Sequence, residues 1–204
     1  MILRNDQQDK IAQGSIGAII LSGGKSSRMG SEKGLVEFNG KPMIQWAIEC
    51  IRPLTDEILI VANDAAYGQF GYPLQEDEAK GDGPLSGLVS GIRHAKTDLN
   101  FLLPCDMPLM DSRLLAWMLE TYDEEAASVC TFEEHLQPLV GIYHRKCLST
   151  LERLLARNQL KMRIALEELQ AAVLDPQRSL AGFHPDWMRN FNSKAEINLY
   201  LQGK

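Results

Sequence analysis

Short apolar segments alternate with helical ones along most of this chain, and this alternation restricts its fold more than any other feature. Residues 17–21 (GAIIL) are apolar, β-branched and too few for a helix, so they predict a buried strand. Residues 43–52 follow Pro42, which favours a first helical turn, and place their apolar side chains on one helical face. Similar patterns predict strands at 57–61, 73–75, 100–103, 127–131, 139–143 and 171–174, and helices at 85–94, 111–122 with Asp111 as N-cap, 148–156, 162–169 and 194–201.

Such an alternation is typical of a mainly parallel sheet that is covered by helices on both faces. In sheets of this kind, ligands bind beyond the carboxyl ends of the strands. Three segments occupy that position: the loop after Leu21, the turn after Val61, and the turn Pro104-Cys105-Asp106, where proline ends the predicted strand. We therefore expect the binding site where these three segments meet.

Length, charge and cysteine content favour a single cytoplasmic α/β domain. The 204 residues suit one domain at 15–204 after a flexible tail at 1–14. The 21 basic against 27 acidic side chains give a net charge of −6, which argues against a nucleic-acid partner. The chain has no apolar leader and no stretch near the ~20 apolar residues of a membrane span. The four cysteines lack metal-binding spacing, so we expect reduced, buried thiols.

A glycine-rich loop follows the first predicted strand directly. Its paired residues Gly23 and Gly24 let backbone N–H groups approach a polyphosphate, and Ser22 can add a hydroxyl contact. Arg28 and Lys33 supply cationic donors for phosphate oxygens. Neither the Walker A pattern nor the dinucleotide-binding G-x-G-x-x-G follows this strand. The alternative is a glycine-rich turn with solvated cations.

Two carboxylates complete the candidate site. Asp106 lies where the apolar 100–103 strand ends, and a carboxylate there can bind Mg²⁺ beside substrate phosphates. The alternative is an aspartate that only caps the following turn. Asp77 follows the predicted 73–75 strand and could accept hydrogen bonds from a nucleobase, although a solvated acidic loop (EDEAKGD) explains it equally well. The histidines have no partners at a spacing that indicates a triad or a metal site.

Several of these motifs together resemble one family. Leu21-Ser22-Gly23-Gly24, Arg28-Met29-Gly30 and Lys33-Gly34-Leu35 are similar to the L-A-G-G-x-x-x-R-M-G-x-x-K-G-L signature of the molybdenum cofactor guanylyltransferases, the MobA family. The resemblance continues through Asn39-Gly40-Lys41-Pro42, Glu76-Asp77, Gly83-Pro84-Leu85-Ser86-Gly87, Pro104-Cys105-Asp106-Met107-Pro108 and Asn190-Phe191-Asn192-Ser193.

The resemblance implies a Rossmann-like three-layer α/β/α sandwich of the nucleotide-diphospho-sugar transferase type. It implies that GTP and molybdopterin react, with Mg²⁺, to give the guanine dinucleotide cofactor and pyrophosphate, and that proteins of molybdenum cofactor delivery are possible partners. By position, GTP would contact Leu21, Ser22, Gly23, Gly24, Lys33, Asn63, Asp77 and Asp106, and Asp106 would also bind the metal.

Two departures from the family pattern concern the site. The family's N-x-N after the second strand is Val61-Ala62-Asn63 here, so only Asn63 can serve. The family also has an N-x-N-T-P element near the end of the chain, and its T-P is Ser193-Lys194 here. This departure lies in the segment expected to face the pterin.

The expected reaction is an in-line displacement in which the terminal phosphate of molybdopterin attacks the α-phosphorus of GTP. Arg28, Lys33 and Asp106 are the predicted catalytic residues, acting by positioning and charge stabilisation. The alternatives are a cytidylyltransferase acting on the same pterin, a sugar-phosphate nucleotidyltransferase, and a non-catalytic nucleotide-binding module. Gly23-Gly24 and Cys105-Asp106 favour guanine, because the cytidylyl relatives resemble L-A-A-G and G-D-x-P at these positions.

Overall fold

The computed structural model describes residues 16–22, 32–77 and 83–203. The predicted tail at 1–14, the loop residues Gly23 and Gly24, and Arg28 lie outside the described residues.

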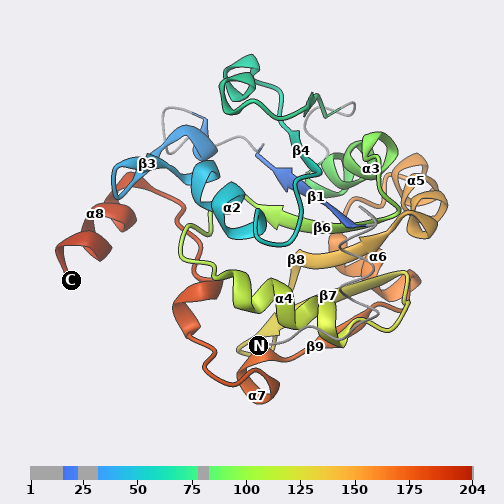
Figure 1. The fold of residues 1–204 in the computed structure, drawn as a ribbon. Coiled ribbons are helices and arrows are strands. Elements are labelled where there is room, and N and C mark those ends of the chain that lie inside the picture. Colours follow the sequence, from blue (N-terminus) through green and yellow to red (C-terminus); the bar gives the residue numbers. More distant parts are fainter. Residues whose placement is uncertain (1–15, 23–31, 78–82, 204) are drawn as a thin grey trace.

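A seven-stranded sheet forms the centre of the molecule, with the strand order β5-β4-β1-β6-β8-β7-β9 (Figure 1). The pairs β1–β4, β1–β6, β4–β5 and β7–β9 are parallel, whereas β8 is antiparallel to both β6 and β7. The mainly parallel sheet that the sequence predicts is therefore confirmed. Its strands are β1 (Ile16–Leu21), β4 (Ile58–Val61), β5 (Leu74–Gln75), β6 (Leu99–Pro104), β7 (Ala127–Phe132), β8 (His135–His144) and β9 (Ala172–Leu174).

The central strand β1 fixes where the loops at the carboxyl edge meet. Leu21 is in register with Val61 of β4 on one side and with Pro104 of β6 on the other. The Ser22 N–H donates to Val61 O at 2.9 Å, and the Cys105 N–H donates to Leu21 O at 3.1 Å. The three segments that follow these strands therefore begin side by side at one edge of the sheet.

Helices cover both faces of the sheet, as expected for three layers (Figure 1). Alternation along each strand separates the two cores, so Ile20 packs on one face and Ile19 on the other. The first face carries α2 (Met43–Ile51) and α4 (Ser112–Thr121), and the second carries α3 (Pro84–His94), α5 (Leu148–Ala156) and α6 (Met162–Glu168). In the described part of the chain, no helix is long and apolar enough to cross a membrane.

A small hairpin and the last described helix lie beside this sandwich. Strands β2 (Glu37–Phe38) and β3 (Lys41–Pro42) join through Asn39 and Gly40, whose φ angles of 49° and 80° are those of a tight hairpin turn. Helix α8 (Lys194–Gln202) packs near this hairpin in a third core that includes Phe38 and Phe191. The remaining helices are α7 (Pro176–Ser179) and the 3₁₀ helices η1 (Lys33–Leu35), η2 (Ala65–Phe70), η3 (Arg145–Cys147) and η4 (Pro185–Met188).

All the predicted strands and helices are present, and their bounds differ from the predicted ones by at most four residues. Asp111 caps α4 as predicted, since its side chain accepts from Arg113 N. One detail is wrong, because Pro42 is the extended residue before α2 and not part of its first turn. Pro104 ends its strand as predicted, as the last residue of β6. Proline is tolerated at the end of a strand because it lacks only the N–H donor, while its carbonyl oxygen can still accept a hydrogen bond.

Candidate active site

Asp106 lies at the carboxyl end of β6, in the position that the sequence predicts for a ligand-binding carboxylate. Its backbone is tied to the C-terminal segment, because Phe191 N donates to Asp106 O at 2.9 Å. The side chain is 15% exposed, so it is shielded but still reachable. The strand end and the distant segment together hold this carboxylate in place.

Lys33 and Asn192 meet Asp106 from two other parts of the chain. The Lys33 ammonium forms an ion pair with Asp106 Oδ2 and donates to Asn192 Oδ1 at 2.7 Å. Lys33 begins η1 after the glycine-rich loop, and Asn192 precedes α8. The structure thus brings the predicted residues Lys33 and Asp106 together and adds Asn192, which was not among the predicted site residues. The signal for it was the N-x-N pattern at 190–192.

One oxygen of Asp106 is suited to a cation. Asp106 Oδ1 is buried and has no hydrogen-bond partner among the described residues. An unpartnered buried carboxylate oxygen is costly unless a ligand satisfies it. Among the same residues, no three His, Cys, Asp or Glu side chains gather to hold a metal on their own. The donor set therefore fits an ion that takes one carboxylate from the protein and its other oxygens from substrate or water.

A buried serine and tyrosine form the floor beneath Lys33. Ser22 follows β1 and is 1% exposed, yet its Oγ has no hydrogen-bond partner among the described residues. Tyr67 of η2 is fully buried beside it, and burial raises the pKa of its hydroxyl well above the usual range. A Cβ on Gly34 would lie only 2.2 Å from Ser22 Oγ and 2.9 Å from Tyr67 Oη. The backbone next to Lys33 therefore packs directly against Ser22 and Tyr67.

Asn63 and Asp77 form a second group near the ends of β4 and β5. The Asp77 N–H donates to Asn63 Oδ1 at 3.1 Å, and Ser86 Oγ donates to Asp77 Oδ2 at 2.8 Å. Leu21 adjoins the same place, since a Cβ on Gly87 would lie 3.3 Å from Leu21 Cδ2 and 3.8 Å from Asp77 Oδ2. The predicted residues thus fall into two groups, one around Lys33 and Asp106 and the other around Asn63 and Asp77.

The departure at Ser193 concerns the start of a helix. Ser193 is the N-cap of α8 and accepts from Glu196 N at 3.2 Å, while Glu196 Oε2 accepts from Asn192 N at 2.7 Å. Serine replaces threonine as a cap without loss of function. With serine at position 193, the first turn of α8 therefore still holds the Asn192 backbone through Glu196.

Cysteine and histidine chemistry is not part of this arrangement. Burial raises the pKa of the Cys105 thiol to about 12, and the neighbouring Asp106 acts in the same direction. His144 and His184 each accept a hydrogen bond from a backbone N–H two residues onward, which makes them local caps. The side chain of Cys105 thus packs in the core, as the sequence predicts.

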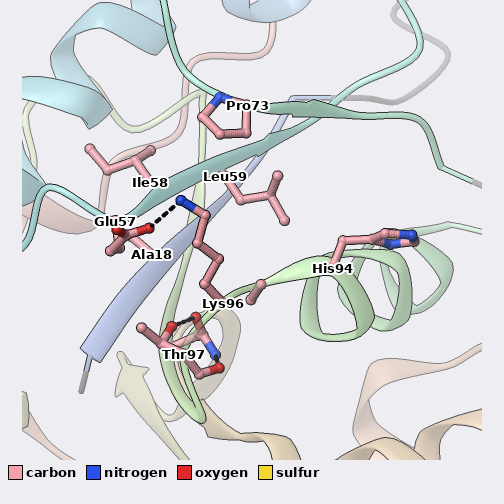
Figure 2. Close-up of a pocket in the computed structure, with 10 residues that line it drawn as sticks. Ala18, Glu57, Ile58, Leu59, Pro73, His94, Lys96 and Thr97 are labelled. Carbon is pink, nitrogen blue, oxygen red and sulfur yellow. Dashed lines mark hydrogen bonds and ion pairs between the residues drawn. The ribbon is translucent and has the colours of Figure 1, made fainter. Parts of the chain in front are cut away.

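The close-up in Figure 2 shows a pocket at the opposite, amino-terminal edge of the sheet, lined in part by Ala18, Ile58 and His94. An ion pair of 3.3 Å joins Lys96 Nζ to Glu57 Oε2 beside it. Thr97 and Asn100 satisfy each other there, with Thr97 Oγ1 donating to Asn100 Oδ1 at 2.6 Å. No polar group of this pocket belongs to the Asp106 site.

Comparison with known proteins matches residues 18–173 to the family described as the MobA-like NTP transferase domain. A probable molybdenum cofactor guanylyltransferase of Flavobacterium johnsoniae is 37% identical over 180 residues, covering 88% of this chain and 93% of the relative. The molybdenum cofactor guanylyltransferase of Vibrio parahaemolyticus is 33% identical over 188 residues, covering 90% and 94%.

A similar fold is found in the molybdopterin-guanine dinucleotide biosynthesis protein A of Archaeoglobus fulgidus, with a TM-score of 0.75 and 22% identity over 90% of this chain and 95% of that one. With the family match and the two relatives above 30% identity, the chain belongs to the MobA-like NTP transferase family and is a nucleotidyltransferase.

Proposed function

We propose that this chain transfers the GMP part of GTP to the terminal phosphate of molybdopterin, giving the guanine dinucleotide cofactor and pyrophosphate. The observation that carries the proposal is the Lys33–Asp106–Asn192 group, with one Asp106 oxygen left for a cation. The relatives from Flavobacterium johnsoniae and Vibrio parahaemolyticus, which cover most of this chain, are named for this guanylyl transfer.

The nucleotide would extend along the carboxyl edge of the sheet between the two groups of residues. Its guanine would lie near Leu21, Asn63 and Asp77, beside the ends of β1, β4 and β5. Its phosphates would contact Ser22 and Lys33, where the unpartnered Ser22 Oγ offers a buried hydroxyl. Gly23, Gly24 and Arg28 remain predicted phosphate contacts, as the sequence motif implies.

Asp106 would hold a divalent metal ion, for which we propose Mg²⁺. Asp106 Oδ1 is the free oxygen, while Lys33 already occupies Oδ2. When bound, the ion would neutralise charge on the triphosphate and on the departing pyrophosphate. The residues present fit this role, because Mg²⁺ is usually held by one or two carboxylates together with substrate phosphates.

Lys33 would orient the reacting phosphate groups. An ammonium group has three N–H donors, and two of them are used by Asp106 and Asn192. The third can donate to a phosphate oxygen without breaking either contact. The attacking phosphate is already an anion, so the reaction needs alignment and charge stabilisation more than a strong general base.

The test is pyrophosphate release from the purified chain with GTP, molybdopterin and Mg²⁺, with the dinucleotide product identified by mass. We expect Asp106→Ala to abolish release, since removal of a single charge contact of this kind lowers rates by ~10²–10³-fold. Asp111→Ala is the matched control, because the contacts of Asp111 are the α4 cap and an ion pair with Arg113. A preference for CTP, or GTP binding without turnover, would overturn the proposal.

A further inference from the structure

A buried serine on the first turn of α3 holds the carboxylate of Asp77. Ser86 is 2% exposed, and its Oγ lies 2.8 Å from Asp77 Oδ2 and 3.0 Å from Gly83 O. A hydroxyl has one proton, so these two acceptors compete for it. The charged carboxylate is the stronger acceptor. Ser86 therefore donates mainly to Asp77.

The surroundings of Asp77 fix its backbone and its side chain separately. Asn63 Oδ1 accepts from the Asp77 N–H at 3.1 Å, which sets the direction in which the chain leaves β5. Gly87 lies beside the carboxylate, since a Cβ there would be in van der Waals contact with Asp77 Oδ2 at 3.8 Å. The carboxylate torsion of an aspartate is otherwise broad. The hydrogen bond from Ser86 therefore favours one orientation of the carboxylate.

A carboxylate with a fixed orientation can distinguish bases by their hydrogen-bonding edge. Guanine presents two adjacent donors, the ring N1–H and the exocyclic 2-amino group, and the two oxygens of one carboxylate can accept from both. Hypoxanthine lacks the 2-amino group, whereas adenine and cytosine present a ring acceptor that a carboxylate repels. The gain from a second hydrogen bond depends on both oxygens being aligned at the same time.

We propose that Ser86 is a positioning residue for base selectivity, which orients Asp77 so that it accepts from both donors of guanine. This inference rests on the proposed function, in which Asp77 contacts the guanine of GTP. It assigns Ser86 no contact with the reacting phosphates. Its loss should therefore change which nucleotide binds, not the rate at which bound GTP reacts.

The experiment is calorimetric titration of GTP and ITP, in Mg²⁺, into the wild-type chain and its variants. We expect the wild type to bind GTP more tightly than ITP, and Asp77→Asn to bring the two dissociation constants close together. Ser86→Ala should lower the GTP-over-ITP ratio by about five- to tenfold, the scale of one ordinary hydrogen bond, because the guanine contact is weakened indirectly. Ser86→Thr keeps the hydroxyl and should restore the ratio.

Two further variants show whether a change in the ratio comes from the lost hydrogen bond or from a folding defect. Ser86→Cys keeps the shape of the side chain with a slightly larger atom but offers only a weak donor, so its ratio should fall as in Ser86→Ala. Ser90→Ala is the matched control, because Ser90 is an equally buried serine one turn later on α3. Its ratio should equal that of the wild type.

The possible outcomes distinguish a failure of the role given to Ser86 from a failure of the proposed function. If Asp77→Asn collapses the ratio but Ser86→Ala and Ser86→Cys keep the wild-type value, the role of Ser86 is rejected and the proposed function stands. If Asp77→Asn leaves the ratio unchanged, Asp77 does not read the base, and both the guanine contact and the role of Ser86 fail. Absence of GTP binding by the wild type would reject the proposed function itself.

Discussion

Gly34 offers a test of how far the position of Lys33, the proposed phosphate contact, depends on the side chains packed against residue 34. In Gly34→Ala, the new methyl group would lie 2.2 Å from Ser22 Oγ and 2.9 Å from Tyr67 Oη. Ordinary contacts between such atoms are about 3.5 Å long. Because Ser22 and Tyr67 are both fully buried, we expect the backbone at residues 33–34 to move outward by about 1 Å.

That displacement sets the size of the expected effects. A misplacement of about 1 Å near the reacting groups can lower the rate ~10²-fold. We therefore expect kcat/KM for GTP to fall ~100-fold, which corresponds to ~2.7 kcal/mol of transition-state stabilisation. Overpacking of this kind also lowers the free energy of unfolding by ~1–3 kcal/mol. In a chain of this size, each kcal/mol lowers Tm by ~2–4 °C.

The assay is steady-state pyrophosphate release together with scanning calorimetry. Gly68→Ala is the control, because it adds the same methyl group on η2, where no atom lies within 4 Å of it. It should keep wild-type activity. The double variant Ser22→Ala/Gly34→Ala removes the closest clashing atom and should recover part of what Gly34→Ala loses in Tm. The reasoning is refuted if Gly34→Ala retains wild-type kcat/KM and Tm, or if the two changes are strictly additive in stability.

Three other expectations follow from contacts in the same structure. Asn192→Ala removes an acceptor from Lys33, and we expect kcat/KM to fall ~10-fold or more, as for a hydrogen bond to a charged group; unchanged kinetics would show that Lys33 needs no support there. Burial raises the pKa of Cys50, Cys105, Cys130 and Cys147 to about 12. At pH 8 none should react quickly with a thiol reagent in the folded chain, whereas all four should react in guanidinium. Burial, with a smaller effect of Lys146, lowers the pKa of His144 below its ordinary 6.5, so the unfolded chain binds that proton more readily. The free energy of unfolding should therefore fall as pH drops below about 6.5, and His144→Gln should flatten this part of the pH profile of Tm.

The strands and helices were predictable wherever local pattern and packing agree. Residues 58–61 form an unbroken apolar run and are buried on both faces in β4, so no other assignment suits them. Asp111 marks the start of α4 through its own side chain. The β2–β3 hairpin was not predicted, because strands of two residues have no period to detect. The insertion of antiparallel β8 between β6 and β7 depends on long-range pairing, which local sequence does not encode.

The residues of the candidate site also differ in how far the sequence could predict them. Lys33 and Asp106 could be predicted because each follows a recognisable strand in the sequence. Asn192 follows no strand, and its place beside Lys33 results from packing of Phe191 against Phe38, with ring centroids 4.9 Å apart. Ser86 belongs to a motif of the family resemblance, but a serine in the first turn of a helix is common, so the sequence alone indicated no role for it. Its importance follows only from the contact with Asp77.

The contact between Lys33 and Asn192 spans 159 positions of sequence, and this has a consequence for synthesis on the ribosome. The last strand of the sheet, β9, ends at Leu174, so every strand has been translated before Asn192 is. Asn192, the third member of the Lys33–Asp106–Asn192 group, is therefore synthesised after the residues of all seven strands. The residues of the supporting sheet are thus made before the group that the sheet helps to position is complete.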